Sequence, residues 1–274
     1  MHEEANAIGV FDSGVGGLTV LRELVSVFPR RSLIYLGDTA RVPYGTKSPE
    51  TIRRYAVQCT RFLMQHRVGM VIIACNTASA LALDAVQDIA GVPVVGTIEP
   101  AVDAALKLTR NGRIGVIGTA ATIASNAFQR LLAQRRGSRS AFVPAQACRL
   151  FVPLAEEGWH RHPVAEQIAG KYLSSMRTSG IDTLILGCTH YPLLIDVIQA
   201  QLPDVALVNS GAEAARQALQ TLQLPPDAGA IIPGEAADRI RCYVSDKTEG
   251  FSRTAARFLG FAPLSVEVVN LEDY

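Results

Sequence analysis

The sequence predicts an α/β protein with two similar, open and mostly parallel sheets, each with helices on both faces. The two sheets are expected to be related by pseudo-symmetry, with the active site between the two domains. Short β-branched runs alternate with longer helical stretches along the chain, as is typical of parallel sheets covered on both faces. Segment 8–13 (IGVFDS) resembles segment 114–119 (IGVIGT), and an apolar run that ends in a cysteine also occurs twice. The two offsets, 106 and 113 positions, are similar, so we expect two related α/β units that face one another.

The predicted strands are short runs of β-branched and apolar residues that end at glycine, proline or polar residues. In order they cover residues 8–11, 32–36, 70–74, 92–95, 113–117, 141–144, 183–186, 205–208 and 241–245. The longer stretches between these runs are plausible helices. In order they cover residues 18–28, 49–67, 77–89, 100–109, 123–136, 164–178, 193–201, 213–222 and 248–259.

Segment 225–233 (PPDAGAIIP) interrupts this alternation and is expected to be a loop. The strand and helix that follow it have no third domain to join, so we expect them to complete the first sheet. The predicted domains are therefore a discontinuous first domain, residues 1–97 plus 209–274, and a second domain, residues 98–208.

The composition favours a packed protein and limits the classes of partner. The chain has 274 residues, of which 49% are apolar and 19% charged, which suits two domains of ordinary size and argues against disorder. The 26 basic and 25 acidic side chains nearly cancel, so the overall charge gives no support to nucleic-acid or membrane binding. No apolar run approaches the roughly 18 residues of a membrane span, and the polar N-terminus does not resemble a signal peptide. Together with an odd number of cysteines, five, these features predict a cytoplasmic protein.

Two cysteines carry the strongest functional signal. Each follows an apolar strand and precedes hydroxyl, amide or imidazole groups: Cys75 precedes Asn76 and Thr77, and Cys188 precedes Thr189 and His190. Open α/β sheets bind ligands at the carboxyl ends of their strands, and a helix N-terminus or nearby donors can lower the pKa of a thiol from about 8.5. Cysteine more often packs as a small apolar residue, and that interpretation is favoured for the three without polar flanks, Cys59, Cys148 and Cys242. Two thiols that face one pocket from opposite sides suit a reaction that removes a proton from one face of a carbon and returns one to the other.

Segment 12–17 (DSGVGG) follows the first strand and leads into a helix. Glycines allow close backbone approach, and a helix start favours an anion such as a carboxylate. The segment lacks the lysine of a phosphate loop and the full spacing of a dinucleotide motif, so nucleotide binding is the weaker interpretation. Asp12 could orient an ammonium group or serve as proton partner for a thiol, or Asp12 and Ser13 could simply cap the helix.

Two further segments supply candidate groups. Residues 37–45 form a polar loop that could reach over a pocket, with Asp38 as a second acid and Tyr44-Gly45 as N–H donors, or it could be an ordinary loop. Glu156 and Glu157 follow an apolar run and are candidate proton partners for Cys188 or His190, or they form the solvated start of a helix. The sequence alone favours Glu156 over Glu157 only weakly.

Neither a metal nor a cofactor is expected. His160 and His162 have no third ligand nearby and are interpreted as surface residues, and Cys188 with His190 offers only two ligands. The lysines, at positions 47, 107, 171 and 247, lie in no motif typical of a Schiff base with pyridoxal phosphate.

Taken together, these motifs resemble those of the bacterial glutamate racemases, within the cofactor-independent aspartate/glutamate racemase superfamily. The resemblance rests on segments 11–19 (FDSGVGGLT), 37–45 (GDTARVPYG), 74–78 (ACNTA), 151–158 (FVPLAEEG) and 187–193 (GCTHYPL). The motifs occur in the right order, whereas the C-terminal third of the chain is less distinctive. One departure is Arg149-Leu150, where many relatives carry a proline, and we expect it to lie outside the site.

The resemblance implies the roles of the site residues. Cys75 and Cys188 would be the two bases, with Asp12 assisting Cys75, and with Glu156 and His190 assisting Cys188. The substrate would be held by Asp12, Ser13, Tyr44, Gly45, Asn76, Thr77, Thr189 and His190. The resemblance also implies a cofactor-independent isomerase that interconverts L- and D-glutamate and supplies D-glutamate for peptidoglycan synthesis, cell-wall biogenesis and cell shape. The expected partner is the small-molecule substrate; a homodimer stays open, and neither nucleic acid nor membrane is expected.

Other functions stay open on the sequence alone. One is a racemase of aspartate or a hydantoin with the same paired thiols, although relatives that act on aspartate tend to carry Glu where this chain has His190. Another is a non-catalytic amino-acid-binding regulator, against which the two flanked thiols argue. A thiol-redox role is disfavoured because the sequence has no Cys-x-x-Cys pair.

Overall fold

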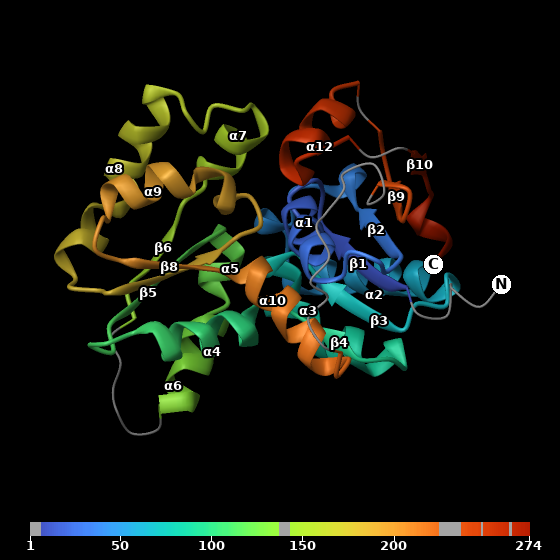
Figure 1. Ribbon diagram of the computed structural model, residues 1–274, viewed down its shortest axis with the longest axis horizontal. Helices are drawn as coiled ribbons and strands as arrows, with labels where there is room; N and C mark the ends of the chain where they lie inside the picture. Colours follow the sequence, from blue (N-terminus) through green and yellow to red (C-terminus); the bar gives the residue numbers. More distant parts are fainter. Residues whose placement is uncertain (1–6, 137–142, 225–236, 248, 263–264) are drawn as a thin grey trace.

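The computed structural model describes residues 7–136, 143–224, 237–247, 249–262 and 265–274. These residues form two sheets, one of six strands in the order β10-β9-β2-β1-β3-β4 and one of four strands in the order β6-β5-β7-β8. Every strand pair is parallel. The order β2-β1-β3-β4 in the first sheet repeats as β6-β5-β7-β8 in the second. The predicted fold class, two similar parallel sheets with pseudo-symmetry, is therefore confirmed (Figure 1).

The first sheet is buried between helices on both faces. Its strands are β1 (Ile8–Asp12), β2 (Leu33–Gly37), β3 (Met70–Ile73), β4 (Val94–Val95), β9 (Ile240–Val244) and β10 (Val266–Val268). Successive side chains of a strand point to opposite faces. Accordingly Val10 packs in the cluster with α1 (Leu18–Val27), α10 (Ser210–Thr221) and α12 (Phe251–Leu259). Phe11 packs in the cluster with α2 (Pro49–Gln65) and α3 (Asn76–Ala90).

The second sheet is covered in the same way. Its strands are β5 (Ile114–Gly118), β6 (Ala145–Ala147), β7 (Thr183–Gly187) and β8 (Ala206–Asn209). On one face the core contains α4 (Ile98–Leu108) and α6 (Ala127–Arg136). On the other it contains α7 (Phe151–Glu156), α8 (Pro163–Thr178) and α9 (Ile195–Gln201). Figure 1 shows α8 and α9 on one side of this sheet and α4 and α6 on the other.

The chain passes from the first sheet to the second after β4 and returns after β8. On its return, α10 packs against both α1 and α4. The strands β9 and β10 then extend the first sheet beside β2, which brings α12 next to α1. The limits proposed for the two domains, 1–97 plus 209–274 and 98–208, stay a prediction.

Some predicted elements are wrong in position or continuity. The strand predicted over 141–144 lies further along the chain, as β6 (Ala145–Ala147). Its place beside β5 is fixed by hydrogen bonds from the N–H of Cys148 to the carbonyl of Gly118 and from the N–H of Val116 to the carbonyl of Pro144. Residues 141 and 142 lie outside the described part. The helix predicted over 123–136 is divided into α5 (Ala120–Ala124) and α6 at Asn126, whose φ is 54°. The helix predicted over 193–201 starts as a short 3-10 helix, η4 (Tyr191–Leu194), before α9.

The sequence patterns missed α7 and β10, which are short. The predicted loop at 225–233 and the N-terminal residues 1–6 lie outside the described residues. Among the helices of the described segments, none combines the length and apolar character needed to cross a membrane.

Candidate active site

A cavity of about 330 Å³ is lined by residues that follow strands of both sheets. Since all strands are parallel, the segments that follow them gather at the carboxyl edges, where open α/β sheets bind ligands. The first sheet contributes Ser13 after β1, Tyr44 and Gly45 after β2, and Cys75, Asn76 and Thr77 after β3. The second sheet contributes Thr119 after β5, Arg149 after β6, and Cys188, Thr189 and His190 after β7.

Both candidate thiols line this one cavity. Cys75 is 6% exposed and Cys188 is 5% exposed, so each is shielded from bulk solvent although it borders the cavity. Both are free thiols. The structure thus brings together, from two different sheets, the pair of groups that the sequence singled out.

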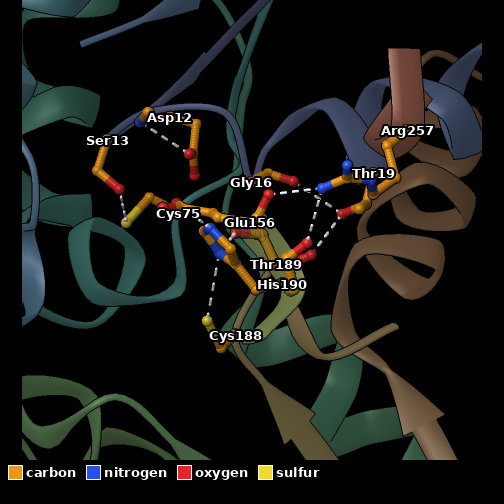
Figure 2. Close-up of polar contacts among 12 residues, drawn as sticks. Asp12, Ser13, Gly16, Thr19, Cys75, Glu156, Cys188, Thr189, His190 and Arg257 are labelled. Atoms are coloured by element: carbon orange, nitrogen blue, oxygen red, sulfur yellow. Dashed lines mark hydrogen bonds and ion pairs between the residues drawn. The ribbon is translucent and has the colours of Figure 1, made fainter. Parts of the chain in front are cut away.

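The surroundings of Cys75 are polar but contain a buried carboxyl group. Cys75 is the residue that precedes α3, and its thiol donates to Ser13 Oγ at 3.5 Å (Figure 2). Burial and the neighbouring Asp12 raise the pKa of Cys75 to about 12, against the opposing effects of Ser13 and the N–H of Ala78. The helix N-terminus therefore does not lower this pKa below its ordinary value, because desolvation outweighs it.

Asp12 lies behind the cavity rather than in its lining. It is fully buried, and its Oδ2 accepts a hydrogen bond from the N–H of Gly14 at 2.9 Å. Among the described residues, its Oδ1 has no hydrogen-bond partner. Burial raises the pKa of Asp12, an effect that the charge of His190 and backbone N–H groups oppose. The contact between Asp12 and the substrate that the resemblance implies stays a prediction.

The surroundings of Cys188 contain a chain of three groups. Its Sγ lies 3.8 Å from His190 Nδ1, and His190 Nε2 lies 2.8 Å from Glu156 Oε1 (Figure 2). Burial alone would lower the pKa of His190, but its hydrogen bonds to Cys188 and Glu156 raise it to about 10. The imidazole is therefore protonated at neutral pH, and a cation stands between the thiol and the carboxylate.

Of the two acidic candidates at 156 and 157, Glu156 is the one that contacts the site. It is the last residue of α7, so the interpretation of this pair as the start of a helix is wrong. The helix itself was not predicted, because its apolar run is only six residues long.

The loop after β2 is held by a buried carboxylate. Asp38 accepts hydrogen bonds from Tyr44 Oη at 2.5 Å, from Arg41 Nε at 2.7 Å and from Ser245 Oγ at 2.8 Å. It is fully buried and does not line the cavity. Asp38 thus fixes Tyr44 and Gly45 at the cavity wall and is not placed to act as a second acid.

Hydroxyl and amide groups of Asn76, Thr77 and Thr119 also line the cavity. The Thr77 hydroxyl lies 2.9 Å from that of Thr119, and the Asn76 amide donates to Ser210 Oγ at 3.0 Å. These contacts fix the orientation of the donors before a ligand arrives. Thr119 was not predicted, although the repeat supplies a signal for it: it follows β5 as Ser13 follows its pseudo-symmetric counterpart β1.

The expectation that Arg149 lies outside the site is wrong. Its neighbour Cys148 follows β6, and both residues line the cavity together with Val152 and Pro153. Of the other lining residues, Gly14, Val42 and Pro43 belong to the two loops that the sequence singled out, whereas Thr46, Ala120 and Tyr191 were not named as site residues.

No candidate metal centre is found in the part of the chain that the structure describes, where no three His, Cys, Asp or Glu side chains are grouped suitably. His162 instead precedes α8, and its Nδ1 accepts the N–H of Val164 at 3.2 Å. The cavity lining itself supplies thiols, an imidazolium ion, a carboxyl group, the guanidinium of Arg149 and neutral hydroxyl and amide groups.

The sequence and the structure are similar to those of known racemases. The family model for Asp/Glu/Hydantoin racemase matches residues 8–218. A glutamate racemase from Geobacter metallireducens is 48% identical over 268 residues, which cover 97% of each chain. A crystal structure of glutamate racemase from Francisella tularensis in complex with D-glutamate has a TM-score of 0.87 and 38% identity, covering 99% of this chain and 100% of that one. A glutamate racemase isoform from Bacillus anthracis has the same TM-score with 35% identity, covering 98% of both chains.

Proposed function

The chain belongs to the Asp/Glu/Hydantoin racemase family, and we propose that it is a cofactor-independent isomerase that interconverts L-glutamate and D-glutamate. The observation that carries this proposal is the pair of thiols, Cys75 and Cys188, that borders one cavity from two sheets. Glutamate is favoured over aspartate or a hydantoin because the near full-length relatives are glutamate racemases. In the cytoplasm the product D-glutamate would feed peptidoglycan synthesis. A homodimer stays an expectation from the resemblance.

The reaction requires one thiolate and one thiol at the start of each turnover. The thiolate removes the α-proton from one face of the substrate, and the thiol on the other face returns a proton to the α-carbon. The two sulfur atoms have then exchanged their protonation states. Because both bases are thiols, neither has to move around the substrate, and both enantiomers can be processed.

The α-proton of an amino acid is far less acidic than a thiol, so the site must stabilise the developing negative charge. Fixed donors achieve this when they point to the place where the charge develops. Asn76, Thr77 and Thr189 line the cavity beside the two sulfurs and are the donors that we assign to the substrate carboxylate. Ser13, Tyr44 and Gly45 complete the wall on the side of the first sheet. Closure of the site against water would strengthen each of these interactions.

The side chains that assist the two thiols act in different ways. We assign His190 and Glu156 to the Cys188 end, where Nδ1 of His190 lies 3.8 Å from the sulfur and stabilises negative charge that develops on it. At the Cys75 end, Asp12 holds the N–H of Gly14 and acts on Cys75 through its charge and through the Ser13–Gly14 turn. A purely regulatory binding protein would have no need for these two differently supported thiols.

The test is exchange of the α-hydrogen in deuterated water, followed by NMR for each glutamate enantiomer, with circular dichroism as the readout of racemisation. We expect exchange and racemisation by the wild type, and a loss of racemisation by about 10⁴-fold in Cys75→Ala and in Cys188→Ala. Cys242→Ala is the matched control, since Cys242 is a buried free thiol in β9. Near wild-type racemisation by either of the first two variants would exclude the two-thiol mechanism, and a wild type that binds glutamate without exchange would be a binding protein.

A further inference from the structure

Two consecutive residues of α12, Arg257 and Phe258, reach the His190–Glu156 pair from the first sheet. The Phe258 ring meets the His190 ring edge-on, with centroids 5.2 Å apart and planes at 82°, a favourable aromatic geometry. Arg257 Nη1 donates to the carbonyl oxygen of Glu156 at 2.5 Å and lies 3.5 Å from that of Ala155. Figure 2 shows Arg257 at this contact, and in Figure 1 both α12 and α7 lie on the upper side of the molecule.

The contact of Arg257 is with the C-terminal end of α7, which has only six residues. The last carbonyl groups of a helix lack partners within the helix, and a cation placed there is stabilised by them and by the helix dipole. The chain then turns at Gly158, whose φ is +77°. A Cβ atom at Gly158 would lie 2.7 Å from Cζ of Arg257. This position therefore needs glycine both for its backbone conformation and to leave room for the guanidinium group.

The anchoring matters because the Glu156 side chain is not fixed by burial. It is 44% exposed, whereas the side chain of His190 is 9% exposed. The position of the carboxylate depends on its backbone, which Arg257 holds, and on the hydrogen bond to His190. His190 itself is confined between Phe258 and the glycine loop, where a Cβ atom at Gly16 would lie 2.5 Å from its Cε1.

We propose that Arg257 and Phe258 are positioning residues that hold Glu156 and His190 in line with Cys188, and that proton transfer at the Cys188 end depends on them. The inference rests on the proposed function, because it assigns these residues a part in the same reaction. Residues 156 and 190 belong to segments that follow the second sheet's strands, whereas α12 packs on the first sheet. The contact therefore ties the geometry of one base to the packing of the other sheet.

The test compares Arg257→Ala, Arg257→Lys and Phe258→Leu with Arg253→Ala, which removes an exposed arginine from the same helix. We expect Arg257→Ala to lower kcat about tenfold while KM changes by less than about twofold. Arg257→Lys should recover part of the loss, because it keeps a cation at the end of α7. Phe258→Leu keeps an apolar side chain of similar volume in the core and should lower kcat less.

A second readout is the NMR titration of the His190 imidazole, assigned through its loss in His190→Asn. In Arg257→Ala the titration midpoint should move down from about 10, since a displaced carboxylate stabilises the imidazolium less; Arg253→Ala should leave it unchanged. If Arg257→Ala matches Arg253→Ala in both readouts, or lowers kcat without moving the titration, the inference is overturned. A wild type that fails to racemise glutamate would overturn the proposed function, while the titration would still decide whether α12 holds His190.

Discussion

Cys75 and Cys188 follow equivalent strands, β3 and β7, of two sheets with the same strand order, but their neighbours differ. Cys75 immediately precedes a helix of 15 residues and has a hydroxyl group and a buried carboxyl group nearby. Cys188 precedes a 3-10 helix of four residues and has an imidazolium nearby. The repeated fold thus places two sulfurs at one cavity, whereas the polar groups beside the two sulfurs are not repeated and give each sulfur a different environment.

This difference bears on how the two sulfurs carry their protons. Burial and Asp12 raise the pKa of Cys75 to about 12, so this residue is a thiol at neutral pH. The sulfur of Cys188 lies 3.8 Å from Nδ1 of His190, so a cation is its polar neighbour. A reaction with two like bases needs them in opposite protonation states, and the two sulfurs have neighbours of different charge.

The asymmetry is constrained by the reaction itself. The two enantiomers have equal free energy in water, so kcat/KM must be the same in both directions. Unequal bases can therefore give the two enantiomers different kcat and different KM values, but the same kcat/KM. The difference between the two thiols has to be tested with variants, pH or ionic strength.

The largest effect is expected when each sulfur is replaced by oxygen. A serine hydroxyl is much harder to ionise than a thiol, so Cys75→Ser and Cys188→Ser should each lower kcat/KM by about 10²–10⁴-fold. The loss should be greater for Cys75→Ser. An alkoxide at 188 would be stabilised by the imidazolium of His190, whereas a serine at 75 would face the carboxyl group of Asp12.

The measurement is racemisation followed by circular dichroism with the two variants at matched concentration, and thermal unfolding serves as the control for folding. A larger loss in Cys188→Ser, or equal losses, would contradict the assignment of the cationic partner to the Cys188 end.

The next effect concerns the charge on His190. His190→Asn keeps polar hydrogen-bonding groups but removes the cation, and we expect kcat/KM to fall about 10²-fold. In the wild type the rate should also decline as the pH rises through about 10, where the imidazolium loses its proton. The pH profile of His190→Asn should lack this limb. An unchanged alkaline limb in the variant would show that another group is responsible for it.

The sequence predicts the two thiols, but not the groups that support them. The apolar strands that end in Cys75 and Cys188 predicted the position of both thiols, because a parallel sheet gathers the ends of its strands. The charge of His190 was not predictable, because it depends on a bond to Glu156, at the end of a helix too short for its periodicity to be recognised. Arg257 could not be found at all, because it lies about 100 positions from Glu156, and only the return of the chain after β8 brings them together.

Asp12 and Arg149 illustrate a second limit. Both follow a strand end closely, which predicts that they are near the site but not which way they point. Asp12 is fully buried and is not among the residues that line the cavity, whereas Arg149 borders the cavity, against the expectation from the sequence. Thr119, by contrast, was predictable, since the repeat relates it to Ser13.

A smaller effect is expected on stability. The pKa of His190 is raised in the folded protein from its ordinary 6.5 to about 10, so the folded state binds the proton more tightly than the unfolded state. Its contribution is fully present below about pH 6.5 and is lost as the pH rises through about 10, at no more than about 1.4 kcal/mol per pH unit. Urea unfolding of wild type and His190→Asn should therefore give free energies whose difference shrinks between these values. A difference that is constant with pH would mean that the imidazolium is not stabilised by folding.

The smallest effect distinguishes the two sides of the cavity rim. On the side of the second sheet the rim carries the exposed Arg149, whereas residues 42–46 on the other side carry no charge. Glutamate is a net anion at neutral pH, so Arg149 should attract it, although an exposed charge acts weakly and is screened within about 8 Å at physiological ionic strength. Arg149→Gln should accordingly lower kcat/KM about twofold at low salt and not at high salt.

Arg110→Gln is the matched control, because Arg110 is exposed and precedes β5, at the opposite edge of the second sheet. If the two variants respond equally to salt, the rim does not guide the substrate, and the difference between the two sides is confined to the groups around the thiols.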